Sequence, residues 1–198
     1  LNIQGSGEGG IGALIATATG TLILDSAASD LTLDAAATIG ADDGGGGTAV
    51  LQIDDAISGT GPITFAGAAS VDLRATNSWT GATNVNNGTL VIGAAVDAIP
   101  DASAVTVAGG ATFDLNDNAE TIGSLAGAGN VTLGSATLTA GGDNTSTAFS
   151  GNLTETGGLT KVGSGVLTLS GNNTYSGATS VDGGSLTAGS ATAFSSTS

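Results

Sequence analysis

Two segments of the chain repeat one another without a gap, and this repeat limits the possible folds more than any other feature of the sequence. Residues 57–99 align with residues 153–195, and 14 of the 43 aligned positions are identical at an offset of 96 residues. The single tryptophan, Trp79, aligns with the single tyrosine, Tyr175. A fixed period indicates stacked units, each of which covers the open face of its neighbour. The repeat therefore predicts an elongated, stacked architecture.

Short strands rather than helices are expected within these units. Triplets in which two apolar residues flank a polar or variable one recur along the chain, at 31–33, 51–53, 71–73, 105–107, 113–115, 131–133 and 167–169. A period of two places both apolar residues on one face of a strand. Gly, Asn, Asp and Ser between the triplets favour turns. No segment carries the apolar stripe of a helix, so the sequence predicts an all-β fold.

Composition and the repeat length together favour one all-β architecture. The chain has 35 glycines and only 3% aromatic residues, which suits a thin core of small side chains. A sandwich or barrel also fits short strands, but a block of 96 residues suits several coils of about 20–25 residues each. We therefore predict an all-β parallel β-helix (β-solenoid) with Gly/Asn/Asp-rich turns. At about 4.8 Å per coil, roughly 8–10 coils would form a rod of about 40–50 Å.

The domain organisation follows from the same alignment. We expect residues 1–198 to form one continuous solenoid segment, with units at approximately 1–56 (partial), 57–152 and 153–198 (partial). Residues 37–40 (ATIG) resemble residues 120–123 (ETIG), which suggests a shorter copy at the start. Because this window starts and stops within a repeat, and open solenoid ends expose sheet edges, we interpret it as a slice of a longer solenoid.

Charge and composition exclude several classes of function. The formal net charge is −15, and Arg74 and Lys161 are the only basic residues. No basic patch can therefore neutralise phosphates, which excludes nucleic acid as a partner and makes an anionic membrane surface repulsive. No apolar run is long enough for membrane insertion by this segment. The chain has no Cys and no His, which removes thiolate chemistry and thiolate metal sites.

The second copy resembles a known repeat family. Residues 156–186, TGGLTKVGSGVLTLSGNNTYSGATSVDGGSL, are similar to the autotransporter-associated β-strand repeat, also called the passenger-associated transport repeat. Residues 119–129 resemble the segment that often precedes this repeat. The resemblance implies a right-handed β-helix in a large secreted or cell-surface bacterial protein, and it carries over no catalytic residues. Pro62 and Phe65 replace the Gly158 and Lys161 of the second copy, so we expect a local difference in strand geometry there.

Acidic residues are the only candidate reactive groups. Asp42-Asp43 and Asp54-Asp55 are adjacent pairs, which alternate across a strand or lie in a turn and do not form a convergent acid–base couple by themselves. We favour solvated turns over a metal or catalytic role. Calcium is the best cofactor candidate, because it accepts carboxylate and carbonyl oxygens. Its Gly-Gly-x-Gly-x-Asp nonapeptide is absent, so we expect no cofactor, no metal site and no catalytic residue.

Three further motifs have structural and functional interpretations. Trp79 and Tyr175 suit a fixed packing position better than exposed sugar-binding platforms. Thr17-Ala18-Thr19 and Thr137-Leu138-Thr139 are typical of flat ice-binding faces, but the sequence does not supply the motif at every coil. Asn87-Gly88-Thr89 and Asn152-Leu153-Thr154 fit the glycosylation acceptor pattern, although Asn in solenoid turns more often forms stacked ladders.

The leading functional hypothesis is a structural, non-enzymatic stalk in an autotransporter-like passenger at the bacterial cell surface or outside the cell. One alternative is an adhesin or a self-assembling extracellular filament subunit, and another is a polysaccharide-active β-helix enzyme. The expected partners are flanking repeats of the same chain. End-to-end self-association, which satisfies open strand edges, and binding of host or surface glycans are further possibilities.

Overall fold

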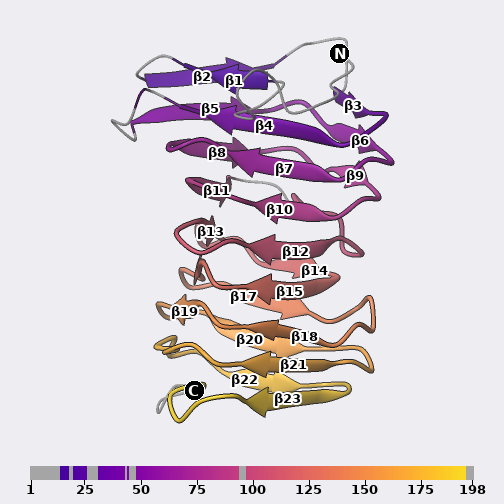
Figure 1. Cartoon of the computed structure of the whole chain (residues 1–198), viewed down its shortest axis with the longest axis vertical. Coiled ribbons are helices and arrows are strands. Elements are labelled where there is room, and N and C mark those ends of the chain that lie inside the picture. Colours follow the sequence, from indigo (N-terminus) through magenta and orange to yellow (C-terminus); the bar gives the residue numbers. More distant parts are fainter. Residues whose placement is uncertain are drawn as a thin grey trace.

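The chain forms a rod built entirely of parallel strands. The computed structural model describes residues 14–17, 20–25, 31–42, 44, 48–93 and 97–194, and these residues form 23 strands and no helix. Figure 1 shows the strands stacked along the long axis, with the N-terminal residues at one end and the C-terminal residues at the other. In the described ranges no helix exists that could cross a membrane.

The strands lie on three faces of the rod. Face 1 is a nine-stranded sheet of β1 (Leu14–Ala16), β4 (Ala37–Ala41), β7 (Ile63–Ala66), β10 (Thr83–Val85), β12 (Ala104–Val107), β15 (Ser124–Gly127), β18 (Thr147–Phe149), β21 (Val166–Leu169) and β23 (Ser185–Ala188). Face 2 is a seven-stranded sheet of β2 (Gly20–Leu24), β5 (Ala49–Ile53), β8 (Ser70–Leu73), β11 (Thr89–Ile92), β13 (Thr112–Asp114), β16 (Asn130–Thr132) and β19 (Asn152–Thr154). Face 3 consists of two sheets, the first with β3 (Leu31–Leu33), β6 (Ile57–Gly59) and β9 (Ser78–Trp79), and the second with β14 (Glu120–Ile122), β17 (Thr137–Ala140), β20 (Gly158–Lys161) and β22 (Thr179–Val181).

The chain passes through face 1, then face 2, then face 3, and each coil pairs in parallel with the next; among the described residues there is no strand on face 3 between β11 and β12 and none on face 2 between β21 and β22. The register on face 1 sets the coil length, which ranges from 26 residues between Ile39 and Phe65 to 19 residues between Leu169 and Ala188. This variation is absorbed in the turns, because the strands stay in register. The predicted all-β parallel solenoid is therefore confirmed.

The core is a set of inward-facing columns that run along the rod. On face 1 Phe65 stacks on Ile39 and Val85, and on face 2 Leu90 stacks between Val71 and Phe113. These six side chains are at most 2% exposed. The residues between the inward positions point outward, as in β3, where Leu31 and Leu33 are buried around a half-exposed Thr32. The period-two triplets of the sequence thus form the interior, as predicted.

The two copies of the repeat lie on different faces. Four coils after Phe65, the register on face 1 reaches Phe149. Lys161, the residue that aligns with Phe65 in the second copy, lies further along the chain, on face 3. The same shift applies throughout, because β8 on face 2 aligns with β21 on face 1. The 96-residue period is therefore not a whole number of coils, and the copies are rotated around the rod axis by one face.

The Pro62 and Phe65 substitutions do not interrupt the strand. β7 begins directly after Pro62, whose carbonyl accepts a hydrogen bond from Ala37 N–H at 3.1 Å. Phe65 in the first copy and Lys161 in the second both point into the core and are each 1% exposed. The expected local difference is thus in the chemistry of the buried side chain, and a strand forms in both copies.

Candidate functional surfaces

The acidic pairs that the sequence singled out lie in turns or hydrogen-bond locally. The Asp42 carboxylate accepts Gly44 N–H at 2.9 Å in an exposed turn, and Asp43 lies outside the described residues. The Asp54 carboxylate accepts both of its hydrogen bonds from Gln52 Nε2, at 2.9 and 3.0 Å. Asp55 is buried at 9% exposure. Asp42 therefore lies in a turn, as the sequence indicated, whereas Asp55 is buried and not in the solvated position that we expected.

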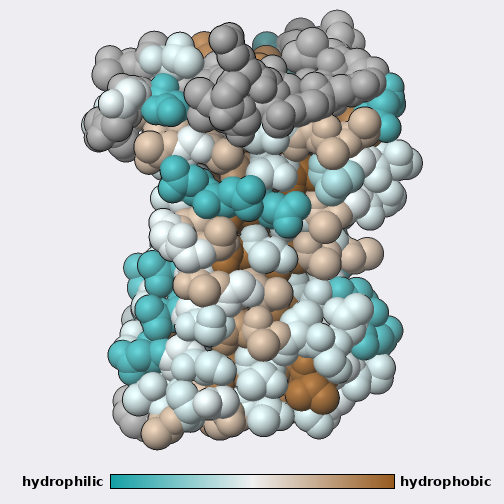
Figure 2. Space-filling model, viewed as in Figure 1, coloured by the Kyte–Doolittle hydropathy of each residue, from teal (hydrophilic) through white to brown (hydrophobic). Residues whose placement is uncertain are grey.

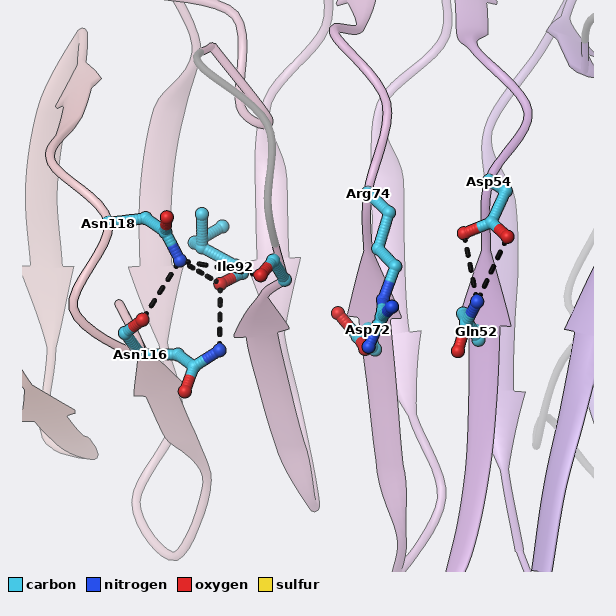
Figure 3. Close-up of polar contacts among 8 residues, drawn as sticks. Gln52, Asp54, Asp72, Arg74, Ile92, Asn116 and Asn118 are labelled. Atoms are coloured by element: carbon cyan, nitrogen blue, oxygen red, sulfur yellow. Dashed lines mark hydrogen bonds and ion pairs between the residues drawn. The ribbon is translucent and has the colours of Figure 1, made fainter.

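Local polar pairs recur on successive strands of face 2 (Figure 3). Arg74 Nε lies 2.8 Å from an Asp72 carboxylate oxygen, one strand below the Gln52–Asp54 pair. Further along the rod, Asn118 Nδ2 donates to the carbonyl of Ile92 at 2.9 Å. Figure 3 shows these groups side by side, each bonded within its own strand or to the adjacent coil. Of the three, only the Asn118–Ile92 bond joins two coils, and the two pairs that contain a carboxylate are local contacts between residues two positions apart.

Potential metal ligands do not cluster in the described part of the chain. There, no group of three or more Asp, Glu, His or Cys side chains comes close enough to hold a metal ion. One exposed carboxylate, that of Asp117, instead accepts hydrogen bonds from the N–H and hydroxyl of Ser135 at 2.7 and 3.0 Å. These hydrogen bonds lower the pKa of the Asp117 carboxyl.

Trp79 and Tyr175 are core residues. Their exposures are 1% and 0%, so neither ring offers a surface platform. Trp79 Nε1 donates to Thr83 Oγ1 at 3.1 Å, and the Tyr175 hydroxyl lies 2.6 Å from Thr179 Oγ1. Each ring therefore buries its apolar body and satisfies its polar atom on a threonine four residues later. The packing interpretation of these two residues agrees with their burial.

Two buried asparagines, which the sequence analysis did not single out as functional, clamp three successive coils. Asn77 Oδ1 accepts Ile57 N–H at 2.7 Å from the coil before, and Asn77 Nδ2 donates to Ala98 O at 2.7 Å in the coil after. In the second copy, Asn173 Oδ1 accepts Leu153 N–H at 2.8 Å and Nδ2 donates to the carbonyl of a residue in the next coil. Their identity at an offset of 96 residues is the signal in the sequence that could have identified them.

Glu120 and Lys161 are buried ionisable residues on face 3. Glu120 is 3% exposed, and its carboxylate accepts Ala98 N–H at 3.2 Å and Ile99 N–H at 3.3 Å. Burial raises the pKa of Glu120 to about 7, against the opposing effect of these hydrogen bonds. The Lys161 ammonium donates to three turn carbonyls, those of Val162, Gly163 and Gly183. Both side chains therefore form hydrogen bonds with backbone groups inside the rod.

The threonine motif does not repeat from strand to strand. Thr139 belongs to an outward column on face 3 with Thr121 and Thr160. Its companion Thr137 aligns with Gly158, so the Thr-x-Thr pair is lost on the next strand. Thr17-Ala18-Thr19 lies partly outside the described residues. A regular double ladder, which an ice-binding face requires, is therefore not formed by β17 and β20.

The two glycosylation-type sites differ in structure. Asn87 is exposed at the turn between faces 1 and 2. Asn152 belongs to a stacked ladder, in which its Nδ2 donates to Asn130 Oδ1 at 3.3 Å and its Oδ1 accepts Asn172 N–H at 2.9 Å. The ladder interpretation therefore holds for Asn152.

Face 1 carries no charge, although the chain is strongly acidic. None of its nine strands contains Asp, Glu, Lys or Arg. The turns from face 1 to face 2 at 67–69, 86–88, 108–111, 128–129, 150–151 and 170–172 are also uncharged. Asp42, in the turn from β4 to β5, is the exception at this corner. Other carboxylates lie on face 2, on face 3 or at the other two corners, at Asp34, Asp54, Asp72, Asp97, Asp101, Asp114, Asp117, Glu120, Asp143, Glu155 and Asp182. Figure 2 views the rod from the side of face 1, where most residues are neither strongly hydrophilic nor strongly hydrophobic.

Comparison with known proteins adds two matches. Residues 58–92 and 159–188 match the passenger-associated-transport-repeat family. The chain is 47% identical over 131 residues to the "Adhesin BmaC autotransporter" of Brucella suis biovar 1 (strain 1330). This alignment covers 65% of the chain and 4% of the relative, so the chain spans a small part of that protein's length. No solved structure matches the chain.

Proposed function

We propose that this chain, whose residues 58–92 and 159–188 are passenger-associated transport repeats, is a stalk segment of an autotransporter-like passenger displayed at the bacterial surface or outside the cell. The observation that carries the proposal is the continuous parallel stack, with nine strands in register on face 1. Such a stack fixes the distance between its two ends through backbone hydrogen bonds and a continuous core, which is the property a spacer needs.

Both ends of the described rod favour contact with flanking repeats. At one end, Leu22 and Ile23 of β2 are 50% and 54% exposed. At the other end, Val181 and Phe194 are 50% and 41% exposed and line a hollow together with Leu186. In the interior of the rod Leu51 and Lys161, the register partners of Leu22 and Val181, are at most 1% exposed. We propose that further coils of the same chain cover both ends, and that a second copy could replace them in an end-to-end stack.

Electron microscopy of the full secreted protein tests the stalk proposal. Discrete rods tethered to cells support a spacer, because each rod then ends in its own anchor or distal module. Micrometre-long fibres would show instead that the open ends stack on other copies, and the filament alternative would replace the stalk.

A non-catalytic role fits the arrangement of the acidic side chains. Inverting and retaining glycosidases need two carboxyl groups about 5–9.5 Å apart across a bound sugar. Asp54 is instead bound by Gln52, and Asp42 lies in a separate turn. A screen of the chain against acidic and neutral glycans should give no turnover. Turnover that is abolished by Asp42→Asn or Asp54→Asn would establish the enzyme alternative.

An adhesive role is the second candidate, and the charge-free face 1 favours it. Exposed Thr106, Ala148 and Thr187 on this face offer hydroxyl and methyl groups without carboxylates. Such a surface can approach a neutral glycan or another acidic molecule without the like-charge repulsion of the other sides. We propose face 1 as the side on which any lateral contact forms.

Calcium is not needed for this fold in our proposal. The acidic turns are held by hydrogen bonds such as those from Ser135 to Asp117. Calcium and magnesium should therefore raise the melting temperature equally, by screening repulsion among the carboxylates. A rise of several degrees with calcium alone would instead identify a calcium site in the Asp-rich turns.

A further inference from the structure

Within the described ranges, the hydrogen-bonded stack is interrupted in the middle of the rod on face 3, whereas face 2 lacks a strand only after β19, near the C-terminal end. On face 3 the first sheet ends at β9 and the second begins at β14, and the coil between them passes as residues 97–103 in turns and bends. On the other two faces the stack continues at this level, because β10 pairs with β12 and β11 pairs with β13. The rod is therefore continuous on faces 1 and 2 and lacks a strand at this level of face 3.

Side chains of the coil before and the coil after form hydrogen bonds in place of the missing strand pairing. From the coil before, Asn77 N–H donates to Asp97 O at 3.1 Å and Asn77 Nδ2 donates to Ala98 O at 2.7 Å. From the coil after, the Glu120 carboxylate accepts the N–H groups of Ala98 and Ile99. Asp97 has a φ of 60°, which is uncommon for a residue other than glycine. The Asn77 amide and the Glu120 carboxyl group thus bind residues 97–99, and Ser103 joins the other end of the segment to both neighbouring coils, because its hydroxyl donates to Gly81 O at 2.9 Å and its carbonyl accepts Gly123 N–H at 2.8 Å.

The N–H groups bonded to Glu120 favour a charged carboxylate, but burial outweighs them and raises its pKa. Its side chain is 3% exposed, and Leu138 is its register partner in β17. Asp97, on the coil before, raises the pKa of Glu120 further, in addition to burial. The other titratable side chains of the flanking turns, Asp101 and Asp117, are exposed and acidic.

Neither basic residue balances this carboxylate. Lys161 lies two strands further along face 3 and donates to the carbonyls of Val162, Gly163 and Gly183. Arg74 forms its ion pair with Asp72. A charge at Glu120 would be buried without a cation, which is costly in a protein interior.

We propose that residues 97–103 form a joint in the rod, which a protonated Glu120 closes and a charged Glu120 loosens. When Glu120 loses its proton, its carboxylate gains more from water than from its buried position, so it turns outward and releases Ala98 and Ile99. Asn77 then remains as the clamp from the coil before. Because faces 1 and 2 stay paired, the two parts of the rod bend at face 3, about the continuous faces. The pKa of about 7 places this change near neutral pH.

Native-state hydrogen exchange of the whole chain tests this joint. After correction for the intrinsic pH dependence of exchange, the protection of the Ala98 and Ile99 amides should fall about tenfold between pH 6 and pH 8, as expected for one proton on a group with a pKa of about 7. The matched Leu153 amide, which Asn173 holds in the second copy, should not change.

Two variants separate the joint from a general effect of pH. In Glu120→Gln the protection of Ala98 and Ile99 should be the same at both pH values, because the side chain no longer titrates. Glu155→Gln removes an exposed carboxylate that accepts Gly134 N–H, and it should keep the pH dependence of the wild type. Equal protection at pH 6 and pH 8 in the wild type, or an unchanged pH dependence in Glu120→Gln, would overturn the proposal. The wild-type series decides even if the variant does not fold.

Discussion

The two copies of the repeat build the same clamp on different faces of the rod. In the first copy, Asn77 and Trp79 lie on face 3, whereas Asn173 and Tyr175 lie at the level of face 2, beside Leu153 of β19. The hydrogen bonds nevertheless match, at 2.7 and 2.8 Å to the coil before. A parallel stack presents the same backbone groups on every face, so the motif needs only a coil before it and a coil after it. The clamp is therefore independent of the face.

The copies differ in what they bury at one inward position. Phe65 packs among apolar columns, while the aligned Lys161 places its ammonium on three turn carbonyls. A buried ammonium is tolerated only where acceptors reach it. The same alignment position is thus occupied by an apolar side chain on face 1 and by a hydrogen-bonded ammonium group on face 3. This difference shows that the local turn decides which side chain is acceptable.

The largest expected effect is the loss of either aromatic ring. Trp79→Ala and Tyr175→Ala should each lower the free energy of unfolding by about 3–5 kcal/mol, because each leaves a large cavity in a buried column. Chemical denaturation measures the change. Tyr175→Phe keeps the ring and loses only its contact with Thr179, so it should cost about 0.5–1.5 kcal/mol. Equal stability of Trp79→Ala and the wild type would refute the packing role of the ring.

The second largest effect should be a pH dependence of stability that arises from Glu120, which binds the end of the first copy at Ala98 and Ile99. The folded-state pKa of Glu120, about 7, lies above its ordinary value of 4.5. Its contribution to stability is therefore complete below about pH 4.5 and is lost as the pH rises through 7. The loss should be of the order of 3 kcal/mol or less. Melting curves between pH 5 and pH 9 should show this fall in the wild type and a smaller one in Glu120→Gln.

Removal of either clamp should have a smaller effect that is similar in the two copies. Asn77→Ala leaves Ile57 N–H and Ala98 O without their buried partner, and Asn173→Ala does the same to Leu153 N–H. Each variant should lose about 1–3 kcal/mol of stability. Asn130→Ala, at an exposed position of the outer ladder, is the control and should stay within about 0.5 kcal/mol of the wild type. A marked difference between the two clamp variants would show that the face matters after all.

The weakest expected effect concerns contact between rods. As the pH falls toward the sequence pI of about 4.1, the rods should associate, because their carboxylates lose charge. Thr106→Asp places a carboxylate on face 1 and should weaken this association, as measured by sedimentation velocity. Thr137→Asp adds the same charge at an exposed position on face 3 and should leave it nearly unchanged. Equal behaviour of the two variants would remove face 1 as the contact side.

Much of the fold could be predicted from the sequence because each coil of a solenoid is specified by short sequence patterns that recur along the chain. Triplets such as 31–33 specify which side chains face inward, and glycines mark the turns. Gly88, with a φ of 66°, is one turn where another residue would be strained and would meet the Ala69 carbonyl. The candidate site residues were less predictable. The Asn77 clamp and the buried Glu120 depend on backbone groups about 20 residues away, which no local pattern reveals.

The sequence by itself determined the all-β class, the repeat, the inward and outward residues and the acidic character of the chain. Only the tertiary structure decided where these features lie around the rod. A period of 96 residues does not correspond to a whole number of coils, and the coil length depends on turns of variable size. The sum of many coil lengths therefore determines the rotation between the copies, the uncharged face 1 and the interruption of face 3. That sum is fixed only when every coil pairs with the one before it.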